Sequence, residues 1–128
     1  MTPQIISGIK IHVSVIFRED LSRVDEGSYF YNYEMTIENQ SEYNVQLLSR
    51  YWKIDHLMCG NEVVKGEGVV GVQPEILSKG TYSYVSGCDL MMPFGNMSGF
   101  YYFKNLNTNQ LFSVPIPKFN LIYPPFLN

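Results

Sequence analysis

The segment Gly66–Gly71, GEGVVG, has the glycine spacing G-x-G-x-x-G that holds phosphate groups in dinucleotide-binding proteins. That motif works because a strand precedes it and the N-terminus of a helix follows it to receive the pyrophosphate. Here Pro74 follows Gly71 by three residues, and the turn signal Ser78-Lys79-Gly80 comes soon after it. No useful helix fits between them, so the spacing does not predict a Rossmann nucleotide site.

Two interpretations of this glycine loop remain. In the first, successive backbone N–H groups form an anion-binding concavity for pyrophosphate or a nucleotide phosphate. Its residues would be Arg50, Lys65, Gly66, Gly68 and Gly71. In the second, the glycines supply positive φ angles or close backbone contacts, and Val69 and Val70 anchor the loop in the core. We favour the second interpretation, because Glu67 in the middle of the loop opposes a bound anion.

The sequence contains residues that could bind a metal or act as nucleophiles, but their spacing does not match a known site. Asp55-His56-x-x-Cys59 is one short cluster, and the methionines Met58, Met91, Met92 and Met97 are scattered. Zinc or cobalt sites need three or four converging ligands, so His12 and His56 would serve as metal ligands only if the fold brought them together. There is no G-x-S-x-G elbow and no Ser or Cys placed beside a supported His. We therefore predict no metal site, no cofactor and no enzymatic activity.

Charge and hydropathy exclude several classes of partner. The 128 residues carry nine Lys and Arg against twelve Asp and Glu, and the basic residues are scattered, which argues against nucleic-acid binding. No apolar run is long enough to span a bilayer, and the start of the chain has no signal-peptide pattern. We expect a cytoplasmic protein without a membrane partner. In that compartment Cys59 and Cys88 are expected as thiols rather than as a disulfide.

Hydrophobic alternation along the chain predicts strands throughout. Apolar residues alternate with polar ones from Ile9 to Phe17 and again from Tyr29 to Ile37. A third strand, Val45–Asp55, should carry Leu48, Trp52 and Ile54 on one face and Val45, Leu47 and Tyr51 on the other. Further strands are expected at 62–64, 81–86, 97–104, 111–116 and 119–123. Seven or eight short strands without helical periodicity predict one antiparallel β-sandwich domain over residues 1–128.

Aromatic residues exceed what one buried face needs. Trp52 on the third strand is expected to fill the core between the sheets. Some of the remaining rings must face outward, and a contiguous outward patch of Tyr and Phe is typical of a protein-binding surface. The residues proposed for this surface are Tyr29, Tyr31, Phe100 and Tyr102. An unpaired sheet edge that forms a homodimer is the alternative contact.

Several segments resemble the ApaG family. They are 45–52 (VQLLSRYW), the glycine loop with Gln73-Pro74, Ser86-Gly87, 95–101 (GNMSGFY) and 114–119 (VPIPKF), so that the resemblance covers nearly the whole chain. There are two departures from the family pattern. Phe100 stands where many relatives have a His, which weakens the idea of a catalytic histidine there, and Cys88-Asp89 replaces small residues.

The resemblance implies an immunoglobulin-like or fibronectin type III-like sandwich. It also implies a link to cobalt resistance and magnesium efflux in bacteria, and a protein-interaction role where the same domain is attached to eukaryotic proteins. Our first hypothesis is therefore a non-catalytic protein-binding module whose partner is unknown. The alternatives are binding of small anions or nucleotides by the glycine loop, and direct binding of divalent cations.

Overall fold

Apolar and polar residues alternate along most of the chain, and the structure accordingly consists mainly of β-strands. A computed structural model describes residues 4–57 and 59–126, so Met58 and both chain ends lie outside the description. Within these residues the chain forms nine strands and three 3-10 helices. In chain order they are β1 (Gln4–Ile6), β2 (Ile9–Phe17), η1 (Glu19–Leu21), η2 (Val24–Glu26), β3 (Tyr29–Asn39), β4 (Val45–Asp55), β5 (Asn61–Glu67), β6 (Glu75–Ile76), β7 (Thr81–Leu90), β8 (Phe94–Asn105), β9 (Leu111–Ile122) and η3 (Pro124–Phe126).

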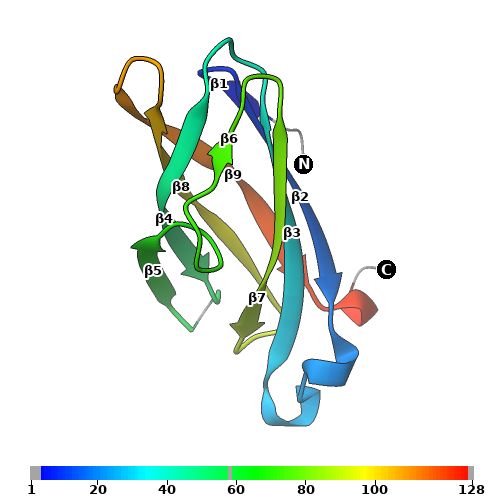
Figure 1. The fold of residues 1–128 in the computed structure, drawn as a ribbon. Helices are drawn as coiled ribbons and strands as arrows, with labels where there is room; N and C mark the ends of the chain where they lie inside the picture. Colours follow the sequence, from blue (N-terminus) through cyan, green and yellow to red (C-terminus); the bar gives the residue numbers. More distant parts are fainter. Residues whose placement is uncertain (1–3, 58, 127–128) are drawn as a thin grey trace.

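The strands form two antiparallel sheets that face each other (Figure 1). One sheet has the order β1-β2-β3-β7. The other has the order β5-β4-β8-β9, and the short β6 also pairs with β4. This arrangement confirms the predicted all-β sandwich. Among the described residues, no helix is long and apolar enough to cross a membrane.

The core lies between the sheets and follows the predicted alternation in β2 and β3. Ile9, Ile11 and Val13 of β2 are buried, and so are the odd-numbered residues of β3 from Tyr31 to Ile37. Cross-strand partners share a face, and the pairing of Ile11 with Ile37 and of Val13 with Met35 puts both strands' apolar residues on one side. The two apolar stripes predicted from the sequence are therefore confirmed.

In β4 the predicted assignment of faces is wrong in part, because a β-bulge interrupts the strand. The pairing with β8 shifts register between Leu47 and Ser49. One extra residue reverses the alternation beyond it, so that Val45, Leu47, Trp52 and Ile54 are all buried. Leu48 at the bulge and Tyr51 are only half-buried. Val45 and Leu47 thus share the core face with Trp52 and Ile54, whereas Tyr51 stays on the face opposite Trp52, as predicted.

A second bulge joins two predicted strands into one. The segments predicted at 111–116 and 119–123 form the continuous strand β9, in which the pairing shifts between Gly99–Ile116 and Met97–Phe119. At this bulge Pro117 and Lys118 of β9 lie opposite the single residue Ser98 of β8. A proline at a bulge costs no ladder hydrogen bond, which explains how β9 continues through it.

Trp52 occupies the middle of the core, as predicted. Its ring centroid lies 5.7 Å from that of Tyr33, 5.9 Å from that of Phe119 and 6.3 Å from that of Tyr101. Gly99 pairs with Trp52 across the sheet, and a Cβ at this position would collide with the carbonyl oxygen of Tyr51. The strands β4 and β8 can therefore approach closely only because residue 99 is a glycine.

Candidate functional site

The glycine loop connects two strands that pair with the same edge of β4. β5 pairs with β4 from Ser49 to Asp55, and β6 pairs with Val45 and Gln46, so that the loop passes beside the bulge at Leu48. The Leu48 carbonyl accepts hydrogen bonds from the Gly68 backbone N–H at 2.7 Å and from the Gln73 side-chain amide at 2.9 Å. The loop therefore continues the pairing with β4 past Ser49 and satisfies the carbonyl of the residue at the bulge.

A tight turn forms the tip of the loop. Val69 and Val72 exchange two backbone hydrogen bonds of 2.7 and 3.1 Å, and the central residues Val70 and Gly71 both have positive φ angles. Positive φ at both central positions is what a type I′ turn requires. Val69 is fully buried, whereas Val70 is 61% exposed. Val69 thus anchors the loop in the core as predicted, but Val70 does not.

Gly68 is the glycine on which this arrangement depends most. Its φ angle is +62°, and a Cβ there would collide with the carbonyl oxygen of Val72. The N–H groups of Gly68 and Val69 both donate to backbone carbonyls inside the protein. These two donors are therefore not available to an anion.

Arg50 and Lys65 do not converge as the anion hypothesis requires. Arg50 pairs with Gly66 and Tyr101 on the core side of the sheet, and its Nη1 donates to the carbonyls of Gly68 at 2.7 Å and Glu67 at 3.2 Å. Lys65 pairs with Tyr51 on the opposite face, where its Nζ lies 5.5 Å from the Tyr51 ring centroid. Alternation along β4 and β5 directs the two side chains to different faces, although both residues border the hollow that also includes Gly66 and Tyr102. The hydrogen bonds of Arg50 to loop carbonyls argue against the predicted joint anion site.

The solvent-facing side of this sheet carries a group of aromatic rings that we call the outer aromatic face: Tyr51, Phe100 and Tyr102. Tyr51 pairs with Phe100, and Ser49 pairs with Tyr102, so that the rings stand side by side on β4 and β8. Phe100 and Tyr102 are 42% and 41% exposed. Both rings thus face outward as predicted, and their role in binding a partner stays a prediction.

A hollow of about 470 Å³ adjoins the outer aromatic face. Its walls include Tyr51 and Tyr102, and on the side of β5 they include Lys65 and Glu67. Gly66 adds no side chain there. The end of β5 that leads into the glycine loop therefore forms one rim of a shallow depression beside the exposed rings.

The other half of the predicted surface is wrong. Tyr31 is 1% exposed, and Tyr29 is half-buried against the ring of Tyr123, with the centroids 5.3 Å apart. Both residues share the face of β3 that carries Met35 and Ile37, and this face packs into the core. Strand alternation thus places Tyr29 and Tyr31 on the core-facing side of the other sheet, away from Phe100 and Tyr102.

The two histidines are far apart in the fold. His12 is exposed on the outer side of β2, whereas His56 follows β4 and is 4% exposed. The His56 Nδ1 accepts a hydrogen bond from the Met91 N–H at 3.3 Å, and its Nε2 lies 3.1 Å from a Glu62 carboxylate oxygen. Both ring nitrogens are thereby occupied. Within residues 4–57 and 59–126 no three metal-ligating carboxylate, thiol or imidazole groups come together.

Phenol and thiol groups line the core on the side of β7. The hydroxyl groups of Tyr84 and Tyr101 form a hydrogen bond with each other. Burial raises the pKa of both groups above the usual value for tyrosine. Burial, with a smaller effect of Glu62, raises the pKa of the Cys88 thiol to about 12. A thiol that stays protonated is a poor nucleophile. Both cysteines are free, and Cys59 is the exposed one.

The comparison with known proteins agrees with this geometry. A family model described as ApaG domain matches residues 19–105, which include the glycine loop and most of both sheets. The chain belongs to the ApaG family. The protein ApaG of Mesorhizobium japonicum is 43% identical over 116 residues, with 91% of this chain and 88% of the relative covered. The protein ApaG of Bdellovibrio bacteriovorus is 40% identical over 119 residues, with 93% of each covered.

Two solved structures have the same fold. A crystal structure of a protein described as ApaA, from Bordetella pertussis, superposes with a TM-score of 0.87 at 33% identity and covers 91% of this chain and 94% of its own. A second X-ray structure reaches the same TM-score at 32% identity. The ApaG fold of this chain is thus shown both by sequence and by structure.

Sequence reasoning missed one residue of the outer aromatic face and one separate cavity. Alternation correctly placed Tyr51 opposite Trp52, but Tyr51 was not included in the predicted aromatic surface beside Phe100 and Tyr102. The second is a cavity at the end of the sandwich near Tyr123, formed by segments more than ninety residues apart. The excess of aromatic residues was the only signal of either feature.

Proposed function

We propose that this ApaG domain is a non-catalytic protein-binding module that docks its partner on the outer aromatic face. The observation that supports it is the position of Tyr51, Phe100 and Tyr102, whose rings stand together on a sheet face and are partly exposed to water. Tyr and Phe are enriched at protein interfaces, because they bury a large area with little loss of side-chain entropy.

The depression beside these rings supports the same proposal. Lys65 lies over the Tyr51 ring, and Glu67 stands at the rim, so that polar groups of both charges surround an aromatic centre. An apolar centre with a polar rim is the usual anatomy of a binding surface. The link to cobalt resistance and magnesium efflux that the ApaG resemblance implies would then arise through the protein partner rather than through a bound ion.

A homodimer through a sheet edge remains the alternative contact. Among the described residues β7 pairs only with β3, which leaves its second edge without a strand. The edge strand β9 differs because Pro115 and Pro117 interrupt its donors. If copies of the chain associate by strand addition, we expect β7 to be the strand that pairs.

The proposed function is tested by affinity capture from the native host. The double variant Phe100→Ser/Tyr102→Ser is compared with the wild-type protein and with Tyr43→Ser, which alters a ring of similar exposure, 46%, outside the outer aromatic face. The wild-type protein and Tyr43→Ser should retain the same partner, and the double variant should lose it. Equal capture by all three, or capture by none, would contradict the proposal.

A further inference from the structure

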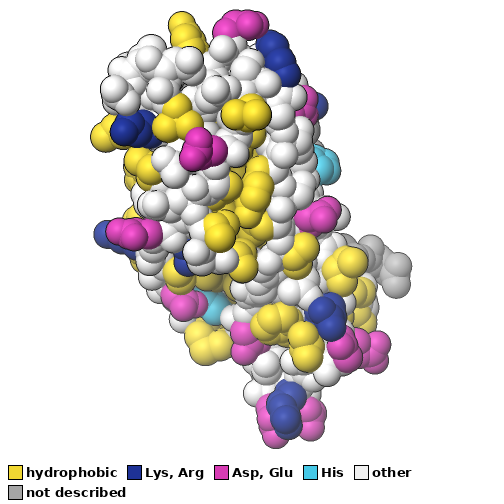
Figure 2. Space-filling view, in the orientation of Figure 1, with side chains coloured by type: hydrophobic (Ala, Val, Ile, Leu, Met, Phe, Trp, Pro, Cys, Tyr) yellow, Lys and Arg dark blue, Asp and Glu magenta, His cyan; other side chains and the backbone are white. Residues whose placement is uncertain are grey.

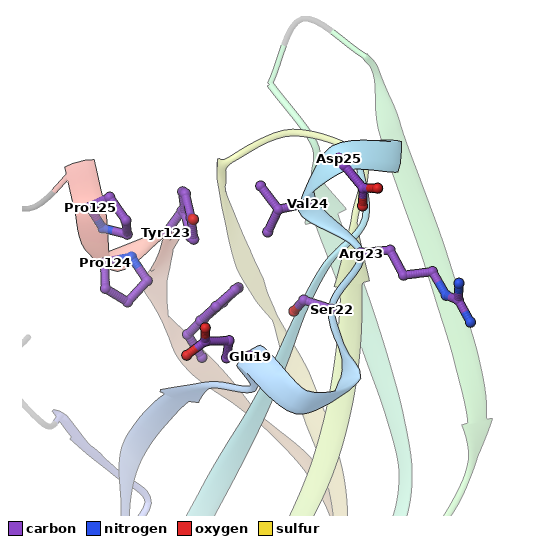
Figure 3. Close-up of a pocket in the computed structure, with 9 residues that line it drawn as sticks. Glu19, Ser22, Arg23, Val24, Asp25, Tyr123, Pro124 and Pro125 are labelled. Carbon is purple, nitrogen blue, oxygen red and sulfur yellow. The ribbon is translucent and has the colours of Figure 1, made fainter.

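A cavity of about 540 Å³ lies at the end of the sandwich, where β2 leaves one sheet and β9 leaves the other (Figure 3). Phe17, η1 and η2 form one wall, and Tyr123 with the two prolines after it forms the opposite wall. Its volume falls in the usual range of ligand sites. It shares no lining residue with the outer aromatic face, and nothing in the proposed function uses it.

Aromatic and proline rings form the apolar part of a mixed lining, whose polar part consists of Glu19, Ser22, Arg23 and Asp25. The ring of Tyr123 lies 5.1 Å from that of Phe17, 5.3 Å from that of Tyr29 and 5.7 Å from that of Phe126, measured between centroids. Pro124 and Pro125 continue this wall, and the partly exposed Val24 faces it. The rings are held on several sides, so that their faces are fixed in position before any ligand arrives.

The carboxylate of Glu19 belongs to the polar part of this lining, which also contains the guanidinium group of Arg23. Arg18 pairs with Asp20 at 2.7 Å, and Arg23 pairs with Glu26 at 3.9 Å. Among the described residues no ion pair includes Glu19. In Figure 3 the Glu19 carboxylate lies between η1 and Pro124, whereas Arg23 and Asp25 extend away from Tyr123 and Pro124.

Charged and apolar side chains are also mixed on the protein surface around the cavity. Figure 2 shows acidic and basic side chains together with hydrophobic ones around η1 and η2, at the lower end of the molecule. Leu21 of η1 and Phe126 of η3 are 51% and 57% exposed beside the cavity. These exposed apolar side chains do not line the cavity themselves, but they offer contacts to a chain that continues beyond the bound group.

We propose that this cavity binds the side chain of a lysine or arginine presented by a partner polypeptide. The alkyl stem would pack against Val24 and the proline rings, and the cationic head would meet the Glu19 carboxylate and the ring face of Tyr123. Cations bind to aromatic faces and long basic side chains pack their stems on apolar surface, so that both parts of the ligand have a complementary wall. A single carboxylate is too few ligands for a hard metal cation.

The assignment is tested by NMR titration of the intact protein, labelled with nitrogen-15. The probes are the capped peptide acetyl-Gly-Lys-Gly-amide, the same peptide with norleucine in place of lysine, and free butylamine. The lysine peptide should shift the amide signals of Phe17, Val24 and Tyr123, and it should bind more tightly than either of the other probes.

Two charge variants make the test specific. Glu19→Gln should weaken binding of the lysine peptide by about three- to five-fold, as expected for a partly exposed ion pair. Glu34→Gln removes the same charge from an exposed position on β3 that does not line the cavity and forms no ion pair among the described residues, and it should leave the affinity unchanged.

Four results would overturn the proposal. They are no shifts near the cavity, equal binding of the norleucine peptide, equal weakening by the two variants, and butylamine binding as tight as that of the lysine peptide. The last result would assign the cavity to free amines instead of a polypeptide. None of these results bears on the outer aromatic face, so that the two proposals fail independently.

Discussion

Tyr51 and Trp52 are neighbours in β4, yet they stand on opposite faces of the five-stranded sheet. Trp52 is 2% exposed and contacts three rings of the core, whereas Tyr51 faces outward beside Phe100 and Lys65. Tyr101 and Tyr102 repeat the contrast in β8, with exposures of 0% and 41%. Within one strand, aromatic residues therefore either pack in the core or stand on the outer face of the sheet.

The difference separates residues that stabilise the fold from residues available for binding. Burial of the inner rings removes apolar area from water and fixes the spacing of the sheets. The outer rings keep much of their surface in water, so that they contribute little to stability and can gain contacts when a partner covers them. The following predictions test this separation, from the largest effect to the smallest.

The largest effect is expected for the inner face. Trp52→Ala should lower the free energy of unfolding by about 3–5 kcal/mol, because it leaves a cavity between Tyr33, Tyr101 and Phe119. Tyr51→Ala should cost much less, since Tyr51 is only half-buried. Urea unfolding followed by circular dichroism measures both. Equal losses would show that the two faces contribute alike to the fold.

The glycine loop should show the next largest effect. Gly71→Ala places a side chain at a positive φ angle in open space and should cost about 1–2 kcal/mol. Gly68→Ala adds a collision with the Val72 carbonyl to the same backbone strain, so that it should cost clearly more. Thermal unfolding of the two variants decides this, and a smaller loss for Gly68→Ala would be inconsistent with the close contact described here.

Alkaline pH should weaken the inner face in particular. Burial raises the pKa of Cys88 from 9.0 to about 12, so above about pH 9 the unfolded chain releases a proton that the folded protein retains. The free energy of unfolding should therefore be constant below this pH and fall above it by at most about 1.4 kcal/mol per pH unit for this group. Tyr84 and Tyr101 should add to the decline above about pH 10, since their pKa values are also raised.

Urea unfolding at pH 7, 9 and 10 in the presence of a reductant measures this dependence. Cys88→Ala should flatten the decline between pH 9 and 10, whereas Cys59→Ala, which removes the exposed thiol, should not. An unchanged slope in Cys88→Ala would mean that the buried thiol does not account for the loss.

The outer aromatic face should affect stability least. Phe100→Ser/Tyr102→Ser should change the free energy of unfolding by no more than about 0.5 kcal/mol per site, the usual range for surface substitutions. The variant that loses its partner should thus remain folded by urea unfolding. A loss comparable to that of Trp52→Ala would remove the distinction between the two faces.

No effect is expected for small anions. Arg50 donates to loop carbonyls, and Lys65 lies over the Tyr51 ring, so that both cations are already engaged within the protein. Isothermal titration with pyrophosphate and with nucleotides at millimolar concentration should give no heat of binding. A saturable signal that Lys65→Ala abolishes would restore the anion hypothesis.

The sequence was sufficient for the sandwich and for most of its core. The alternation in β2 and β3 is regular, so that the apolar stripe from Ile9 and the one through Met35 both translate directly into buried faces. Family resemblance added the identity of the fold. The prediction failed at Leu48, because a bulge inserts one residue without any sign in the hydrophobic pattern and reverses each face beyond it.

Candidate sites were predicted less well than strands. Tyr29 and Tyr31 have the composition of a binding surface, but they continue the buried stripe of Met35 and Ile37, and this continuity was the better guide. Lys65 and Arg50 were grouped by their distance in the chain, although cross-strand pairing puts them on different faces. The end cavity depends on Tyr123 meeting Phe17, a contact between distant segments that no local pattern encodes.

The central claim is that the outer aromatic face, and not the rest of the exposed aromatic surface, meets a partner in the cell. Its most direct test is photocrosslinking in the native host with p-benzoylphenylalanine placed at Tyr102 or, as the control, at the similarly exposed Tyr43. Tyr102→p-benzoylphenylalanine should yield a discrete adduct with a second protein, and Tyr43→p-benzoylphenylalanine should not. Adducts from Tyr43 alone, or from neither position, would contradict the account.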